Sequence, residues 1–307
     1  MSHARVGTQK HHASQLTTET HFISAKPKNP NERSKVMTGA ENTLRYFLRT
    51  YDSLSKNITA TKLRLQSILP DADPMDHPEV QDMEKLKGKL SRRIDKELEL
   101  YPIWTEWMKE IGGIGPFIAG NLIMLYYFRH IALCKKCGAD LVDFKCPACE
   151  WTASGSGLLT FRIEEKDFPN ISKWWKYMGV HCGEDGSKPK RQKGVKQDWS
   201  TIGRNIAWHI GENINKQKPD NLYKGFYLMR KDKREKTHPK ASKGHRHNMA
   251  KNETAKLFLA HFWIAARTID AKTVTEPYAG TIMGHTGIID PFYYEGEIKY
   301  SNRLKAA

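Results

Sequence analysis

The sequence predicts a mainly α-helical protein, in which a helical hairpin precedes a helix-hairpin-helix-containing helical domain that carries a small four-cysteine ribbon. Three observations predict this fold class. Apolar residues recur at helical spacings of three and four, glycines break one apolar run at 111–122, and four of the five cysteines stand in two C-x-x-C pairs. The length of 307 residues allows two or three domains with a sizeable core.

Apolar stripes give the order of the elements. One stripe predicts a helix from Leu44 to Ile68, the stretch PDADPMDHP ends it, and a second stripe predicts a helix from Met83 to Leu98. Together they form an antiparallel, coiled-coil-like hairpin, which serves either packing or homodimer formation. Further helices are expected at 103–111, 117–129, 201–216, 222–236 and 247–268, with a short strand in 154–163 and a short helix that ends at Gly179.

These elements divide the chain into six expected segments. In order, they are a flexible basic arm (1–36), the helical hairpin (37–100), the helix-hairpin-helix (101–130), the cysteine ribbon (131–155), a basic helical domain (156–270) and a turn-rich tail (271–307).

The glycine-broken run IGGIGPFIAGNL at 111–122 predicts a tight turn between two helices. Gly113 and Gly115 allow backbone angles that other residues avoid, and Pro116 suits the first turn of the following helix. The amides of such a turn converge with the next helix N-terminus on one spot, which binds a phosphate oxygen without reading sequence. The alternative is a helix that ends on glycine caps and restarts at proline. We expect the hairpin, with both glycines as DNA-backbone contacts.

The two C-x-x-C pairs, which are eight residues apart, predict a metal site formed by Cys134, Cys137, Cys146 and Cys149. Four thiolates complete a closed tetrahedral site with no open position for water, so we expect a structural Zn²⁺ ion in a zinc ribbon. An iron–sulfur cluster or a redox pair is the alternative, although the sequence lacks a thioredoxin-like context for the latter. Three lysines of the ribbon would add phosphate contacts: Lys135, Lys136 and Lys145.

Basic residues are concentrated in one part of the chain. The formal charge is +16, and residues 186–251 hold 18 Lys/Arg against 5 Asp/Glu, so +13 of the +16 lies there. A field of one sign attracts polyanions, and we expect DNA as the partner rather than a merely solubilising surface. The residues expected to contact DNA, besides the two glycines, are Lys188, Lys190, Arg191, Lys193, Lys196 and Arg246.

The remaining histidines and the fifth cysteine predict no second site. His238, His245 and His247 stand among lysines and arginines without an acidic partner at ligand spacing, so we expect phosphate contacts rather than metal binding. His261 and His285 are expected to pack with hydrogen bonds. Cys182 is expected to be a passive thiol.

Several classes of protein are not indicated. The chain has neither a Walker loop nor the converging carboxylates of a two-metal nuclease. It also has no apolar run of roughly 20 residues and no secretory signal. We therefore expect no membrane association and a cytoplasmic location, nucleoid-associated if the protein binds DNA.

The order of motifs over roughly residues 40–295 resembles a known family. After the helical hairpin and GGIGPFIAGNLI come WWKYMGV, GSKPKRQKG, WSTIGRNIAWHIGENI, YKGFYLMRKDKRE and GHRHNMAKNETAKLFLAHFW. This succession resembles the C-terminal helix-hairpin-helix transposase domain of the DEDD-type (bridge-RNA class) insertion-sequence transposases. In the given sequence we expect no RuvC-like domain with its four acidic residues before residue 40, and we expect the zinc ribbon to be an insertion. The resemblance implies DNA transposition or recombination guided by an element-encoded RNA.

The resemblance also implies a nucleophilic serine in the loop after YMGV, where the serine of GEDGSKPKRQKG is Ser187. Its setting, Gly-Ser followed by Lys, departs from the family's serine–glycine pair. If it acts, Lys188 and Arg191 would stabilise the phosphorane charge. Three functions stay open: a DNA-binding protein that is catalytically incomplete alone, an active recombinase that uses Ser187, and an RNA-binding or ribonucleoprotein module without catalytic activity.

Overall fold

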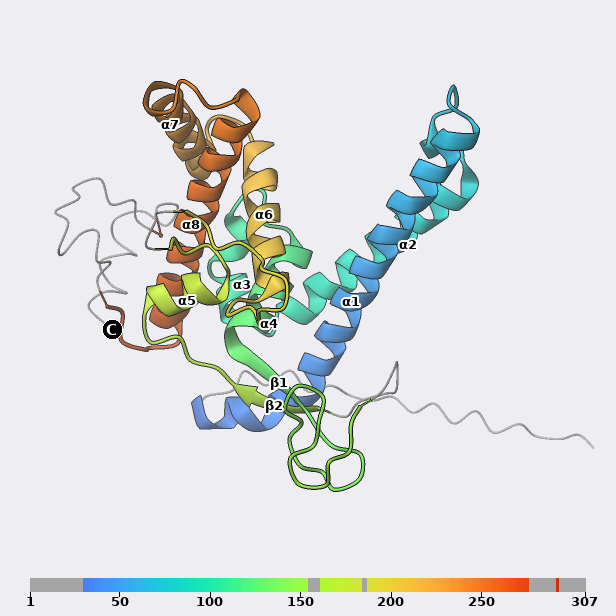
Figure 1. Cartoon of the computed structure of the whole chain (residues 1–307), viewed down its shortest axis with the longest axis vertical. Coiled ribbons are helices and arrows are strands. Elements are labelled where there is room, and N and C mark those ends of the chain that lie inside the picture. The colour runs from blue at the N-terminus through green and yellow to red at the C-terminus, as the bar shows by residue number, and fades with distance from the viewer. Residues whose placement is uncertain (1–29, 154–160, 184–186, 276–290, 293–307) are drawn as a thin grey trace, which may run out of the picture. The chain divides into compact units, whose positions relative to one another are not determined.

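The computed structural model describes residues 30–153, 161–183, 187–275 and 291–292 (Figure 1). The chain consists of two compact units, Met1–Met37 and Thr38–Ala307. Of the first unit, the structure describes only the opening turns of helix α1 (Pro30–Ile68), and the packing of the other elements lies within the second unit. The predictions for residues 1–29, for most of the tail and for His285 fall outside the described residues. Residues 30–36, which were expected to belong to the flexible arm, are helical in α1.

The predicted mainly α-helical fold class is confirmed. The described residues form eight α-helices and one two-stranded sheet. After α1, the elements are η1 (Pro74–Asp76), α2 (Pro78–Leu98), α3 (Pro102–Thr105), η2 (Met108–Glu110), α4 (Pro116–Tyr127), β1 (Phe128–Ala132), β2 (Phe161–Glu165), α5 (Ile171–Tyr177), α6 (Thr201–Asn215), α7 (Leu222–Thr237) and α8 (Lys243–Ile269).

Helices α1 and α2 run antiparallel, as the two apolar stripes predict (Figure 1). Lys62 of α1 forms an ion pair with Glu84 of α2 at 2.9 Å, and Arg93 of α2 lies over the ring of Phe47 in α1. The break at PDADPMDHP is confirmed as the short helix η1, whose N-cap Asp73 accepts a hydrogen bond from the Met75 amide. Apolar side chains fill the space between the two helices and the rest of the unit: Leu44, Leu48, Ile58, Val80, Leu90, Ile94 and Leu98 are all buried.

The later helices begin where the sequence supplies a polar N-cap. The side chains of Asn170, Ser200, Asn221 and Ser242 each accept a hydrogen bond from the amide three residues on, which starts α5, α6, α7 and α8. The starts of α6 and α7 agree with the prediction. Helix α8 begins at Lys243 rather than at 247, because the cap is Ser242.

Helix α8 lies in the centre of the core. It contacts α3, α5, α6 and α7. Phe262 of α8 meets the rings of Tyr126, Trp174 and Trp107 at centroid distances of 5.2, 5.7 and 6.3 Å. Two buried indoles add hydrogen bonds to backbone carbonyls, Trp174 to Leu259 and Trp263 to Phe168. The basic helical segment is therefore built on an aromatic core.

The predicted helix at 103–111 is wrong. Only two short turns, α3 and η2, occupy this segment, because Trp107 leaves the helical backbone region with φ −137° and ψ −61°. The Trp107 indole is fully buried 5.4 Å from the Phe258 ring, and its N–H donates to the Pro291 carbonyl at 2.7 Å. Tertiary packing of one large side chain therefore overrides the local helical pattern. Between α2 and the glycine turn stand only the four-residue helix α3 and the turn η2, so the predicted helix-hairpin-helix is not confirmed.

The predicted helix at 117–129 ends earlier than expected. Helix α4 stops at Tyr127, and Phe128 begins strand β1, which the apolar pattern does not predict. Strand β1 pairs antiparallel with β2, from Phe128 opposite Glu165 to Ala132 opposite Phe161. The predicted strand in 154–163 is thus confirmed for its last residues. The cysteine ribbon lies between the two strands in sequence.

Candidate metal centre and basic surface

The four cysteines predicted as ligands meet at one point. The sulfur atoms lie within 4.8 Å of one another, with Cys134 Sγ 3.5 Å from Cys149 Sγ and Cys137 Sγ 3.4 Å from Cys146 Sγ. A disulfide needs a sulfur–sulfur distance of about 2.05 Å, whereas a tetrahedral ion with bonds of about 2.3 Å needs about 3.8 Å. All four cysteines are free. The cluster is therefore arranged to hold a metal ion.

The two C-x-x-C pairs fold alike. In each pair the amide of the first cysteine donates to the residue five positions on, Cys134 to Ala139 and Cys146 to Trp151. The carbonyl of the first cysteine accepts from the residue four positions on, Gly138 or Glu150, and that residue takes a left-handed backbone with φ 75° or 58°. These paired turns place the sulfur atoms of both pairs on one ion.

Backbone amides favour the charged thiolate of Cys146. Burial acts to raise its pKa, but N–H groups of Cys149 and Ala148 point at the sulfur, and the net result is a pKa of about 6. Cys134 is also buried and receives an N–H donor from Lys136 at 3.4 Å. A deprotonated sulfur is the form that ligates metal. The pKa values of the other two thiols, Cys137 and Cys149, are raised in the cluster without an ion. The fit to a metal ion therefore rests on the convergence of the four sulfur atoms.

The glycine turn at 111–116 packs onto the end of α6. Gly113 has φ +94°, and a Cβ there would lie 3.3 Å from the Asn213 backbone. At Gly115, by contrast, a Cβ would meet nothing within 4 Å.

Gly115 is the N-cap of α4, and no side chain caps that helix N-terminus. A shallow hollow of about 360 Å³ lies here, lined by Gly113, Ile114, Gly115, Asn213, Lys216 and Gln217. Gly113 is thus needed for helix packing, and Gly115 faces the hollow.

The basic loop holds Ser187 and Lys188 next to α6 and α8. The Ser187 carbonyl accepts a hydrogen bond from the Gly183 amide at 2.8 Å. Lys188 Nζ donates to Asn252 Oδ1 of α8 at 2.6 Å. Burial lowers the pKa of Lys188 to about 8, and the like charge of Arg204 acts in the same direction. The side chain of Lys188 is half-buried, whereas the side chains of Lys190, Arg191 and Lys193 are exposed.

Eight of the 18 basic residues in 186–251 are bound within the chain. Arg246, an expected DNA contact, donates to the carbonyls of His238, Pro239 and Ala241 and so holds the turn between α7 and α8. Lys196, another expected contact, pairs with Asp143 of the cysteine ribbon at 2.7 Å. The other members of this set are Lys188, Arg204, Lys224, Arg230, Arg234 and Lys251.

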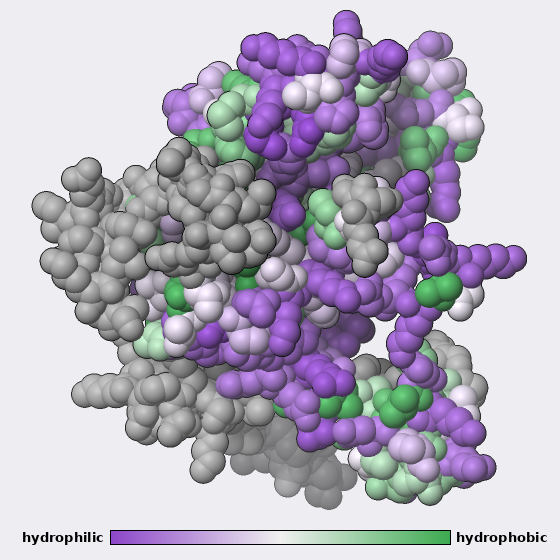
Figure 2. All heavy atoms as spheres, turned by 60° about the vertical axis from the view of Figure 1, so that its left-hand side comes forward, coloured by the Kyte–Doolittle hydropathy of each residue, from purple (hydrophilic) through white to green (hydrophobic). Residues whose placement is uncertain are grey.

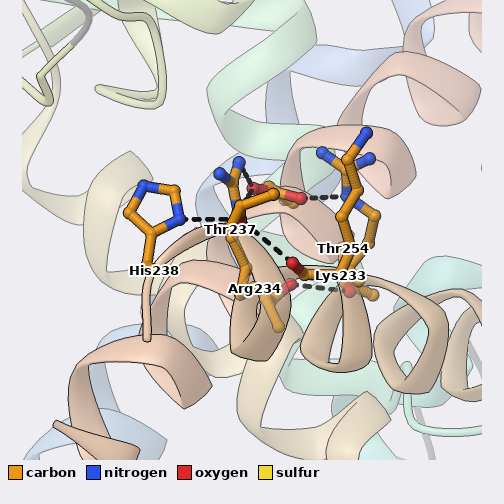
Figure 3. Close-up of polar contacts among 8 residues, drawn as sticks. Lys233, Arg234, Thr237, His238 and Thr254 are labelled. Atoms are coloured by element: carbon orange, nitrogen blue, oxygen red, sulfur yellow. Dashed lines mark hydrogen bonds and ion pairs between the residues drawn. The ribbon is translucent and has the colours of Figure 1, made fainter. Parts of the chain in front are cut away.

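An arginine–glutamate–arginine cluster joins α7 to α8. Arg230 and Arg234 of α7 both donate to the carboxylate of Glu253 in α8. Figure 3 labels Arg234 with its neighbours Lys233, Thr237 and His238. One turn further along α7, Thr237 Oγ1 donates to the Lys233 carbonyl and lies 2.8 Å from His238 Nδ1. These two arginines therefore stabilise the helix pair, although the sequence places them among the residues that make the region basic.

The side chains of the other ten basic residues have no hydrogen-bond or ion-pair partner among the described residues. They form three groups: Lys190, Arg191 and Lys193 in the loop before α6, Lys216 and Lys218 at the end of α6, and Lys231, Lys233, Lys236, Lys240 and Lys243 from α7 to the start of α8. All are exposed except Lys231, which is half-buried. Hydrophilic side chains dominate the visible face where α7 and α8 meet (Figure 2). We call these ten residues the open cations.

The histidines are placed differently from one another. His261 is buried with its Nδ1 2.8 Å from the Tyr223 hydroxyl, which confirms the predicted packing role. His247 Nδ1 lies 2.6 Å from the Tyr227 hydroxyl, and burial lowers its pKa, so its ring is neutral at pH 7. The phosphate contact stays a prediction for His247, because a neutral imidazole still carries one N–H that can donate. Cys182 is exposed and lies outside the metal cluster.

One feature of this surface is absent from the sequence-based predictions. The indole of Trp208 is 51% exposed on α6, beside a hollow between α6 and α8. The helical period would have indicated it, because Trp208 lies next to the buried residues Ile206, Ala207 and Ile210 without belonging to their stripe.

Comparison of the chain with protein-family models, with curated protein sequences and with solved structures finds no match. None of the described helices combines the length and the apolar composition needed to cross a bilayer.

Proposed function

We propose that the protein binds DNA through its phosphate backbone and acts in DNA transposition or recombination. The observation that carries the proposal is the set of open cations. Internal ion pairs and hydrogen bonds engage eight of the 18 basic residues, and the ten that remain lie in three groups at the surface. Exposed lysines and arginines without acidic partners attract a polyanion and release its counterions on binding. The link to transposition comes from the sequence resemblance alone.

The four cysteines are assigned a structural Zn²⁺ ion in this proposal. Four sulfur ligands complete a tetrahedral zinc site and leave no position for water or substrate. The ion would fix the ribbon that carries Lys135, Lys136 and Lys145, all of which are exposed. The ion's contribution is therefore to hold three further cations in place, and no chemical step is assigned to it.

The test is the salt dependence of DNA affinity. Fluorescence anisotropy with a labelled duplex should give an affinity that falls linearly with salt on a double-logarithmic plot. Replacing Lys190, Arg191 and Lys193 with glutamine should reduce the slope by about 0.9 for each phosphate that the variant no longer neutralises. Affinity that is weak at low salt, or that does not respond to salt, would overturn the proposal.

A matched variant controls for net charge. Arg64, Lys89 and Arg92 are exposed on α1 and α2 without an ion-pair partner among the described residues, and their replacement with glutamine removes the same number of charges. This control variant should keep the wild-type slope. A structured RNA that competes better than duplex DNA would instead favour the RNA-binding alternative.

A second candidate function is recombination with Ser187 as the nucleophile. The observation in its favour is that Ser187 is exposed in the loop directly before the half-buried Lys188, whose ammonium would stabilise the charge that develops on the phosphate. An active protein should form a covalent adduct with a nicked or branched DNA that disappears in Ser187→Ala and persists in Ser200→Ala. The absence of an adduct on any of these substrates contradicts this function and leaves DNA binding intact.

A further inference from the structure

We propose that the groove between α6 and α8 receives one unpaired base of a nucleic acid, stacked on the indole of Trp208. This inference rests on the proposed nucleic-acid binding, and it names the part of the ligand that this groove takes.

The groove is small and open on one side. Its hollow has a volume of about 190 Å³ and is lined by Ala207, Trp208 and Gly211 of α6 and by Asn248, Lys251 and Asn252 of α8. Sites for cofactor-sized ligands have volumes of about 300–1,000 Å³. A single planar ring system suits this hollow, and a larger ligand does not.

Gly211 creates the groove. A Cβ at this position would lie 2.9 Å from the Lys251 carbonyl oxygen, so the two helices touch here and no side chain from position 211 fills the hollow. Lys251 is 6% exposed and forms an ion pair with Glu212, so its charge is already balanced. The floor of the groove is therefore closely packed and close to neutral.

Trp208 supplies a stacking surface at the rim. It is half exposed, although Ala207 and Ile210 of the same helix turn are buried. The Lys251 ammonium lies 5.6 Å from its ring centroid. Stacking of a base on an aromatic side chain does not depend on which base it is, because every base has a π-face.

Two asparagines and a basic loop surround the stacking position. Asn252 uses its Oδ1 to accept from Lys188, which leaves its amide N–H groups as donors at the hollow. Asn248 is exposed at the same wall and offers both a donor and an acceptor, as the edge of a base requires. Lys188 is continuous with Lys190 and Arg191, two open cations. A strand whose phosphates follow this loop would therefore place one base at Trp208.

The experiment compares two probes that differ in one nucleotide. One is a fully paired DNA duplex, and the other is the same duplex with a single unpaired 2-aminopurine. Wild-type protein should bind the bulged probe more tightly and change its fluorescence by stacking. Trp208→Ala should weaken binding to the bulged probe roughly tenfold or more and abolish the fluorescence change. It should leave the affinity for the paired probe within about twofold.

Two matched variants and the paired probe separate the possible failures. Trp208→Phe keeps a ring and should keep most of the affinity, whereas Ile202→Ala removes another exposed apolar group of α6 and should change neither probe. Suppose that the wild type binds both probes with salt dependence. The stacking proposal is then wrong if Trp208→Ala binds both probes as tightly as the wild type does, or if it loses the same affinity for both. If the wild type binds neither probe, the proposed DNA-binding function itself fails.

Discussion

Glu41 on α1 is a buried acid whose ionisation opposes folding. It is 3% exposed, and its Oε2 atom has no hydrogen-bond partner in the described part of the chain. Burial, together with the negative charge of Glu165, raises the pKa of Glu41 from 4.5 to about 7. Burial of the Tyr101 side chain raises the pKa of its hydroxyl, and the negative charge of Glu41 acts in the same direction. The folded state therefore favours a protonated carboxyl group at this position.

This residue should make stability depend on pH. A folded-state pKa above the unfolded value gives a contribution that is complete below about pH 4.5 and is lost as the pH rises through about 7. Glu41→Gln keeps the shape without the charge. It should raise the free energy of unfolding at pH 8 by up to about 3 kcal/mol, since each pKa unit is worth about 1.4 kcal/mol. At pH 4.5 it should have little effect. Urea unfolding at both pH values measures the difference.

Glu84 provides the control with the opposite sign. Its hydrogen bond from Lys62 at 2.9 Å lowers its pKa, so the ionised form is the one that stabilises the hairpin. Glu84→Gln should destabilise at pH 8, and this effect should vanish as the pH falls through the folded-state pKa. Equal pH responses of the two variants would contradict the assignment of Glu41.

At the scale of elements, the cysteine ribbon is a separately stabilised insertion. It lies between β1 and β2, and its own backbone contacts are the paired turns around the four sulfur atoms together with short bridges such as Val142 to Lys145. Of residues 133–153, only Cys134 and Cys146 are buried, and so small a core does not keep a chain segment folded without a bound metal. The helical core around α8, in contrast, is formed by aromatic contacts outside the ribbon.

Removal of the metal should therefore unfold the ribbon and leave the helices. Chelation, or Cys146→Ser, should expose residues 133–153 to protease while helix content by circular dichroism changes little. The intact protein should contain about one zinc ion per chain by elemental analysis. Cys182→Ser is the matched control, because Cys182 is exposed and outside the cluster, and it should keep the metal. Less than about one ion per chain after gentle purification would contradict the zinc assignment.

At the scale of the whole molecule, Trp107 joins the middle of the chain to its C-terminal part. Its indole is completely buried beside Phe258 and Phe262 of α8, and its N–H reaches the Pro291 carbonyl, 184 positions later. Phe292, the next residue, is 2% exposed. This hydrogen bond therefore joins two segments that are far apart in the sequence of the second unit.

Trp107→Phe should lower the stability of the whole unit. It leaves the Pro291 carbonyl without its donor, which costs about 1–3 kcal/mol, and it removes buried ring volume as well. A single cooperative transition in thermal unfolding should shift down by several degrees. Trp208→Phe makes the same chemical change at an exposed indole and should shift the transition much less. Equal shifts would show that the Pro291 hydrogen bond does not stabilise the unit.

The sequence by itself determined the features that depend on near neighbours. Helical periodicity specified α6 and α7 and the later parts of α1 and α2, since one face of each helix must be buried. It did not place the starts of α1 and α2, at Pro30 and Pro78. The spacing of the four cysteines specified their cluster, because a C-x-x-C turn places two sulfur atoms on one side of a loop.

Only the tertiary structure decided which side chains are available. Arg234 and Glu253 are 19 positions apart, and Lys196 and Asp143 are 53 apart, so nothing in their local sequence shows that they meet. The same holds for Trp107, whose partner lies in another part of the chain and breaks a predicted helix, and for β1, whose pairing with β2 ends α4. Charge and apolar pattern are local properties of a chain, whereas ion pairing, burial and strand pairing depend on elements that folding brings together.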